Sequence, residues 1–111
     1  MNSQDDKMKF DHIALSTSNI EKSVDWYKKN LNCVIEYVDS TWAMLDCCGT
    51  RIALVTKGQH PPHIAFQVES SLKFPCDASK VKHHRDRSSY YYGSDPDGNI
   101  IEWVAYTNDE E

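Results

Sequence analysis

The length, composition and charge of the chain narrow what it can be. It has 111 residues, of which 40% are hydrophobic and 26% charged, and its formal net charge is −5. These values predict a globular chain and exclude a disordered one, and the acidic balance argues against nucleic acid or an anionic membrane as the main partner. No apolar run approaches the roughly 20 residues of a membrane span. We therefore expect a flexible tail over residues 1–9 and a single domain over residues 10–107.

The first half of the chain predicts the element order β-α-β-β-β. Residues 11–17 alternate and are rich in β-branched side chains, which is typical of a strand. Ser18 and Glu21 have the spacing of a capping box. They precede a helix expected to end near Asn30, with apolar residues at helical spacing. Strands over residues 33–39, 42–48 and 51–57 follow, with a turn at Gly49 between the last two.

The second half predicts a similar order with one ambiguous stretch. Two prolines in residues 58–62 predict a connector, and residues 62–68 predict the next strand. Residues 70–82 have only a weak helical pattern that Pro75 interrupts, so we expect a short helix or two turns there. Residues 83–87 are a candidate edge strand, and residues 89–94 and 100–106 are strands. Between these last two, Asp95-Pro-Asp-Gly98 predicts a type I turn.

The two halves resemble each other in motif as well as in element order. The sequence His12-Ile-Ala-Leu parallels His63-Ile-Ala-Phe, and each half ends with a strand after a glycine. We therefore predict an α+β fold of paired βαβββ modules, residues 10–57 and 62–107. These would form a cupped mixed sheet with helices on its outer face. The apolar faces of the two first strands are expected to pack under the helices, and the faces with His12 and His63 to line the concave side.

Three residues are candidate metal ligands: His12, His63 and Glu102. A single strand histidine is more often structural, but here two histidines occupy the same position in each half. Glu102 is a carboxylate in an otherwise apolar strand, where it needs a partner. Two imidazoles and one carboxylate suit one divalent metal ion (Fe, Mn, Zn or Ni) and leave coordination positions for a substrate.

The cysteines Cys33, Cys47, Cys48 and Cys76 are expected to be free thiols. Cys47 and Cys48 are adjacent on a predicted strand and so point to opposite faces. No CxxC pair and no secretory signal are present. A reducing, cytoplasmic location is the interpretation that follows.

The segments DHIALST, NIEKSVDWYKKNL, PHIAFQV and YYYGSDPDGNIIEWV resemble the vicinal oxygen chelate superfamily over about residues 10–106. This superfamily takes in glyoxalase I, bleomycin-resistance proteins, thiol transferases and extradiol dioxygenases. The resemblance implies paired modules with metal ligands on their first and last strands. The matching positions here are His12, Ala53, His63 and Glu102. Alanine cannot coordinate, so three ligands remain, a pattern similar to that of the thiol transferases and dioxygenases.

Further residues are spaced as in the extradiol dioxygenase signature. His83 or His84, followed by Tyr92, matches it, and the resemblance implies that His84 acts as an acid–base group and that Tyr92 contacts the substrate. Tyr91 stands where that signature has an aliphatic residue, and Tyr90 and Tyr92 also fit a structural aromatic strand face. Arg51, Gln67 and Tyr90 are expected to bind the substrate.

Two functions follow from these observations. The first is a metal-dependent small-molecule enzyme, dioxygenase-like or lyase- or transferase-like. The second is a non-catalytic binding or resistance protein that uses the same cup. The resemblance also implies a homodimer.

Overall fold

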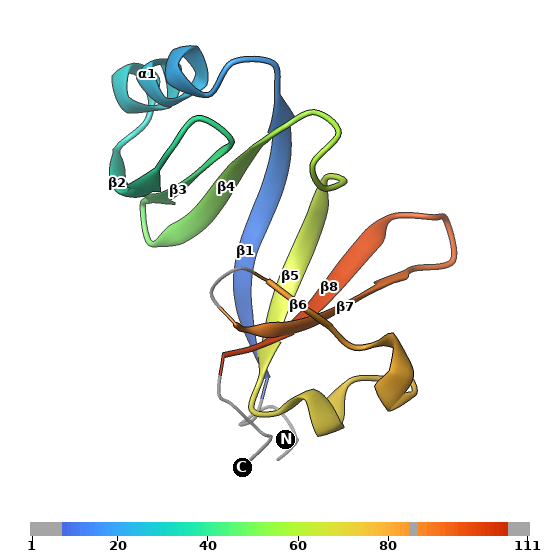
Figure 1. Ribbon diagram of the computed structural model, residues 1–111. Coiled ribbons are helices and arrows are strands. Elements are labelled where there is room, and N and C mark those ends of the chain that lie inside the picture. Colours follow the sequence, from blue (N-terminus) through green and yellow to red (C-terminus); the bar gives the residue numbers. More distant parts are fainter. Residues whose placement is uncertain (1–7, 85–86, 107–111) are drawn as a thin grey trace. The chain divides into compact units, whose positions relative to one another are not determined.

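The computed structural model describes residues 8–84 and 87–106. The chain divides into two compact units. One, which we call the helical unit, is His12–His63; the other, the C-terminal unit, comprises Met1–Asp11 and Ile64–Glu111. Figure 1 labels the helix and strands of both units and colours them along the sequence. The predicted tail, residues 1–9, lies outside the described residues except for its last two, which begin a strand.

The helical unit has the predicted β-α-β-β-β order. Its elements are β1 (Met8–Thr17, shared with the C-terminal unit), α1 (Ile20–Asn30), β2 (Cys33–Val38), β3 (Trp42–Cys47) and β4 (Thr50–Thr56). The strands are ordered β2-β3-β4-β1. β1 runs parallel to β4, and the other neighbours are antiparallel. The expected mixed sheet is therefore confirmed in this unit.

Alternation along β3 and β4 explains the core of the helical unit. Ile20 and Val24 of α1 pack on one face of the sheet with residues from β3 and β4, namely Ala43, Leu45, Cys47 and Leu54. A second cluster on the opposite face contains the alternating residues Met44, Ala53 and Val55, together with Ala14 of β1. Because successive strand residues point to opposite faces, α1 covers the Leu54 side and not the Ala53 side.

The start of α1 differs from the prediction. Asn19, not Ser18, is the N-cap, and its side chain accepts a hydrogen bond from the backbone N–H of Lys22 at 2.9 Å. The side chain of Thr17 in turn accepts a bond from the N–H of Asn19 at 3.0 Å. The predicted capping box is therefore wrong by one residue, because Thr17 ties down Asn19 and thereby sets the first turn. The helix ends at Asn30, as predicted.

The C-terminal unit contains β5 (His63–Val68, of which His63 itself belongs to the helical unit) and two 3-10 turns, η2 (Ser71–Lys73) and η3 (Ala78–Lys80). The strands β6 (Lys82–His83), β7 (Ser89–Ser94) and β8 (Ile100–Ala105) follow. Its strands are ordered β5-β8-β7-β6, with β5 parallel to β8. Its described residues hold no α-helix, so the expected helix on an outer face is present only in the helical unit. Pro75 lies between the two turns, where it prevents a continuous helix. The expected edge strand over residues 83–87 is shorter, and residues 85–86 lie outside the described part of the chain.

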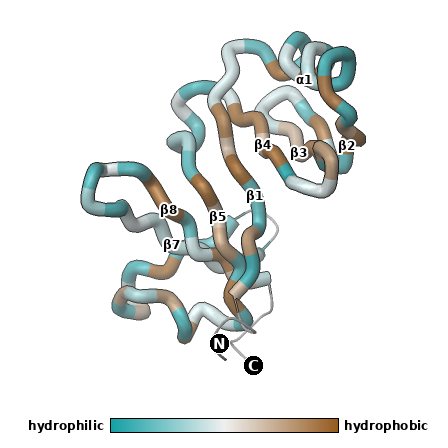
Figure 2. The backbone as a smooth tube through the Cα atoms, turned by 180° about the vertical axis from the view of Figure 1, so that it is seen from behind, coloured by the Kyte–Doolittle hydropathy of each residue, from teal (hydrophilic) through white to brown (hydrophobic). Residues whose placement is uncertain are grey.

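The apolar residues of the C-terminal unit gather where β5 and β8 meet the 3-10 turns. Val68, Phe74 and Ala105 are buried together, with Tyr91 and Trp103 packed against them. Figure 2 shows β8 as largely hydrophobic and the turn between β7 and β8 as hydrophilic. In that turn the N–H of Gly98 donates to the carbonyl of Asp95 at 3.1 Å, as the predicted type I turn requires.

Two expectations about packing and covalent links are wrong. Leu15 and Ile64 are each 37% exposed, so the apolar faces of β1 and β5 are not packed under helices. The reason is that α1 covers β3 and β4 instead. Cys33 and Cys47 form a disulfide, whereas Cys48 and Cys76 are free. The β2–β3 register places Cys33 directly opposite Cys47, with 4.1 Å between their Cα atoms.

None of the helices in the described residues is long and apolar enough to span a membrane.

Candidate functional site

The helical unit brings the two predicted histidine ligands together. His12 lies in β1 and His63 is the first residue of β5; each is 8% exposed, and their ring centroids are 5.4 Å apart. The Nδ1 of His63 lies 2.6 Å from the carbonyl oxygen of Pro61. Since a carbonyl can only accept, Nδ1 is the donor in this contact, and in the neutral ring the lone pair is then on Nε2. His63 is thus held in the tautomer that a metal ligand requires.

Ala14 and Ala53 are in register on neighbouring parallel strands of this unit, and both are buried. Ala53 is the position at which the resemblance expects a further ligand. A methyl group has no donor atom, so Ala53 supplies no ligand, and both alanines pack with Met44 and Val55.

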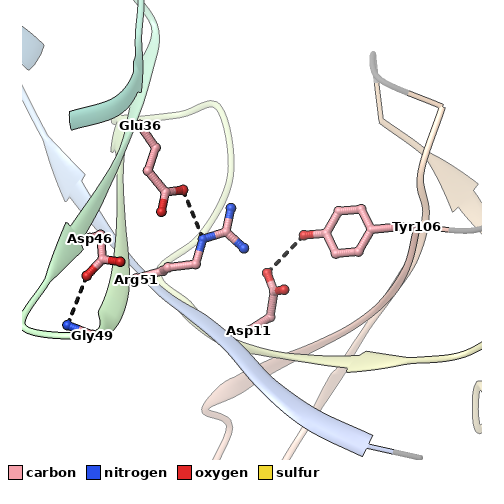
Figure 3. Close-up of polar contacts among 6 residues, drawn as sticks. All are labelled: Asp11, Glu36, Asp46, Gly49, Arg51 and Tyr106. Carbon is pink, nitrogen blue, oxygen red and sulfur yellow. Dashed lines mark hydrogen bonds and ion pairs between the residues drawn. The ribbon is translucent and has the colours of Figure 1, made fainter. Parts of the chain in front are cut away.

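Arg51 on β4 makes an ion pair on the surface of the helical unit. Its Nε donates to Oε1 of Glu36 at 3.1 Å, and both side chains are more than one third exposed (Figure 3). Glu36 sits where the β2–β3 register shifts, and such a bulge redirects a side chain. The expected role of Arg51 in substrate binding stays a prediction.

In the C-terminal unit, Glu102 is the centre of a second group of predicted residues. It is 1% exposed and lies opposite Tyr92 of β7 and Ala65 of β5. Nε2 of His84 lies 2.8 Å from Oε2 of Glu102. We call His84, Tyr90, Tyr92 and Glu102 the carboxylate cluster.

The aromatic rings of the carboxylate cluster contact one another. The ring of Tyr90 lies flat on that of His84, with centroids 3.8 Å apart, and meets the ring of Tyr92 edge-on at 5.2 Å. Burial raises the pKa of both Tyr90 and Tyr92 above the usual range, and the negative charge of Glu102 raises both further. At neutral pH both phenols therefore keep their protons and can donate hydrogen bonds.

Gln67 of β5 belongs to the same unit and is half-buried. It is in register with Val104 of β8, which lies opposite Tyr90 of β7. The structure thus places Gln67 and Tyr90 on either side of one β8 residue, two positions from Glu102.

Two features near the predicted residues were not foreseen from the sequence. One is the bond of His63 to the Pro61 carbonyl, which depends on backbone geometry that sequence does not specify. The other is Asp11, a buried carboxylate whose Oδ2 accepts a hydrogen bond from the hydroxyl of Tyr106 at 2.9 Å (Figure 3). The sequence did offer one indication of Asp11, because it is a charged residue inside a predicted strand and directly precedes His12.

Comparison with known families gives one match that covers most of the chain. The model of the Glyoxalase/Bleomycin resistance protein/Dioxygenase superfamily matches residues 9–103.

Solved structures with the same fold include proteins of several activities. Methylmalonyl-CoA epimerase from Mycobacterium tuberculosis aligns over 90% of this chain and 89% of that chain, with 14% identity and a TM-score of 0.69. A hypothetical protein from Bacillus halodurans aligns over 94% and 98%, with 15% identity and a TM-score of 0.71. A variant of homoprotocatechuate 2,3-dioxygenase from Brevibacterium fuscum aligns over 92% of this chain and 35% of that chain, with 18% identity and a TM-score of 0.56. At these identities the likeness concerns the fold.

Proposed function

Because the chain belongs to the Glyoxalase/Bleomycin resistance protein/Dioxygenase superfamily, we propose that it is a metal-dependent enzyme acting on small molecules. One divalent metal ion would be held by His12, His63 and Glu102. The observation that carries the proposal is the contact of His63 Nδ1 with the Pro61 carbonyl oxygen at 2.6 Å, which leaves Nε2 as the ring nitrogen that can bind a metal.

The residues of each unit fit this use. Two buried imidazoles at van der Waals range are an unusual pair for a core that only needs packing. A carboxylate that is 1% exposed is costly unless it has charged or hydrogen-bonded partners. A donor set of two nitrogens and one oxygen suits Fe(II), Mn(II), Zn(II) or Ni(II), and disfavours Ca(II), which prefers oxygen ligands alone.

The substrate we propose is a small molecule with two adjacent oxygen atoms. A bound divalent ion supplies Lewis acidity to those oxygens. The protonated phenol of Tyr92 is the proposed hydrogen-bond donor to a substrate oxygen. Tyr90 contributes an aromatic surface, Gln67 an amide, and Arg51 a cation for an anionic substituent.

The reaction type we propose is dioxygenase-like or lyase- or transferase-like. The fold alone does not choose between these chemistries, because the same fold supports an epimerase and a dioxygenase among the solved structures. A cytoplasmic location, a homodimer and an acid–base role for His84 stay predictions.

The test is the metal content of protein purified without chelator, for the wild type, His63→Ala and Glu102→Gln. His83→Ala is the matched control, because His83 is an exposed histidine on the edge strand β6. We expect about one equivalent of Fe, Mn, Zn or Ni in the wild type and the control, and loss of that equivalent in the other two variants. Iron would direct assays to oxygen uptake with catechols, and the other metals to thiol transfer or isomerisation. A wild type that takes up no metal even after reconstitution would overturn the proposal in favour of a binding protein.

A further inference from the structure

The contact between His84 and Glu102 connects the edge of the C-terminal unit to its most buried carboxylate. His84 is 18 residues from Glu102 in sequence, and its Nε2 lies 2.8 Å from Oε2 of Glu102. The side chain of His84 is 27% exposed and that of Glu102 is 2% exposed. His84 therefore reaches the carboxylate of Glu102 from the solvent side.

Two further contacts hold the His84 ring in this position. The ring stacks on Tyr90 at an interplanar angle of 12°. The backbone N–H of His84 donates to the carbonyl of Ser88 at 2.9 Å, which continues the pairing of β6 with β7. Ring and backbone are thus both fixed, as a residue that orients another group requires.

From this geometry we infer that His84 is a positioning residue, which fixes the orientation of the Glu102 carboxylate by holding Oε2. The inference rests on the proposed metal site. A carboxylate that binds an ion through one oxygen can rotate about its last bond unless the other oxygen is tied down. A hydrogen bond from the Nε2–H of His84 to Oε2 removes that freedom, so that Oε1 is presented to the ion. This role differs from acid–base chemistry on a substrate, because His84 acts through Glu102.

The competing assignment is that His84 is itself a ligand. A nitrogen and an oxygen bound side by side to one ion also lie near 3 Å apart, given bonds of about 2.0–2.2 Å. The ring position alone therefore does not separate the two assignments. The number of imidazoles bound to the metal does separate them.

The experiment compares the wild type with His84→Ala, His84→Gln and the control His83→Gln, using zinc affinity measured against a competing chelator. Loss of an outer partner weakens metal binding by about 10–100-fold, and we expect this for His84→Ala. Gln can donate one hydrogen bond to a carboxylate oxygen, so His84→Gln should recover most of the affinity, and the control should match the wild type. Thermal unfolding in chelator shows whether each variant is folded.

X-ray absorption of the zinc-loaded proteins supplies the second readout. The inference predicts the same number of imidazole ligands in the wild type and His84→Gln, and an unchanged visible spectrum when cobalt replaces zinc. Loss of one imidazole in His84→Gln would make His84 a ligand and overturn the positioning role. Wild-type affinity in a folded His84→Ala would overturn it as well. Failure of the wild type to bind zinc, iron, manganese or nickel would instead overturn the proposed function on which the inference rests.

Discussion

In metal-free buffer the variant Glu102→Gln should be more stable than the wild type, whereas in metal-loaded buffer it should be less stable. Glu102 is 1% exposed, and its burial as a carboxylate costs several kcal/mol that its partners must offset. Gln has the same shape and leaves no cavity. Its carbonyl oxygen can still accept from His84 Nε2, which lies 2.8 Å from Oε2 in the wild type.

The magnitude follows from these contacts. Replacing the carboxylate by a neutral amide of the same shape removes the cost of burying a charge. We expect the variant to be about 1 kcal/mol more stable in chelator, because the amide oxygen keeps the hydrogen bond with His84. For a chain of this size that corresponds to a rise of about 3–5 °C in unfolding midpoint. With zinc at about 100 times its Kd, the wild type should gain about 2.7 kcal/mol. The variant should gain none, because a neutral amide is a poor ligand.

Urea and thermal unfolding, each in chelator and in zinc, measure both effects. Glu36→Gln is the matched control: it makes the same chemical change at an exposed ion pair with Arg51. This substitution should change the free energy of unfolding by no more than about 1 kcal/mol in both buffers. If Glu102→Gln is destabilised by more than about 1 kcal/mol in chelator, the charge of Glu102 supports the fold and the reasoning fails. Equal gains with zinc for variant and wild type would remove Glu102 from the ligand set.

Three further predictions concern the fold that supports the site. Leu54 is 1% exposed beneath α1, so Leu54→Ala should cost about 2–5 kcal/mol of unfolding free energy. Leu72 is 84% exposed, so the control Leu72→Ala should cost less than about 0.5 kcal/mol. Similar urea midpoints for the two variants would contradict the described core. Asn19→Ala should lower the unfolding free energy by about 1 kcal/mol through loss of the N-cap, and Ser18→Ala should change it little. A larger loss for Ser18→Ala would instead show that Ser18 is the N-cap. Thiol titration in denaturant without reductant should find two thiols per chain, Cys48 and Cys76. Four thiols would mean that the disulfide is absent, as expected of a protein in a reducing compartment.

The local sequence pattern was enough to predict most secondary structure. The alternation of residues 11–17 and 100–106, the helical spacing from Ile20, and the turn chemistry of Asp95-Pro-Asp-Gly98 each act over a few residues. All four features appear in the structure within about three residues of their predicted bounds. The duplicated His-Ile-Ala motif also singled out His12 and His63, which the helical unit places together.

Tertiary structure decided what depends on strand register and on backbone carbonyls. Cys33 and Cys47 became a disulfide because β2 and β3 pair in one particular register, and shifting that register by one residue would turn either side chain to the other face. The tautomer of His63 depends on where the Pro61 carbonyl points. The contact of His84 with Glu102 joins residues 18 positions apart through the β6–β7–β8 pairing. Periodicity specifies which face of a strand a residue occupies, but only the packed sheet specifies which residue on the neighbouring strand it meets.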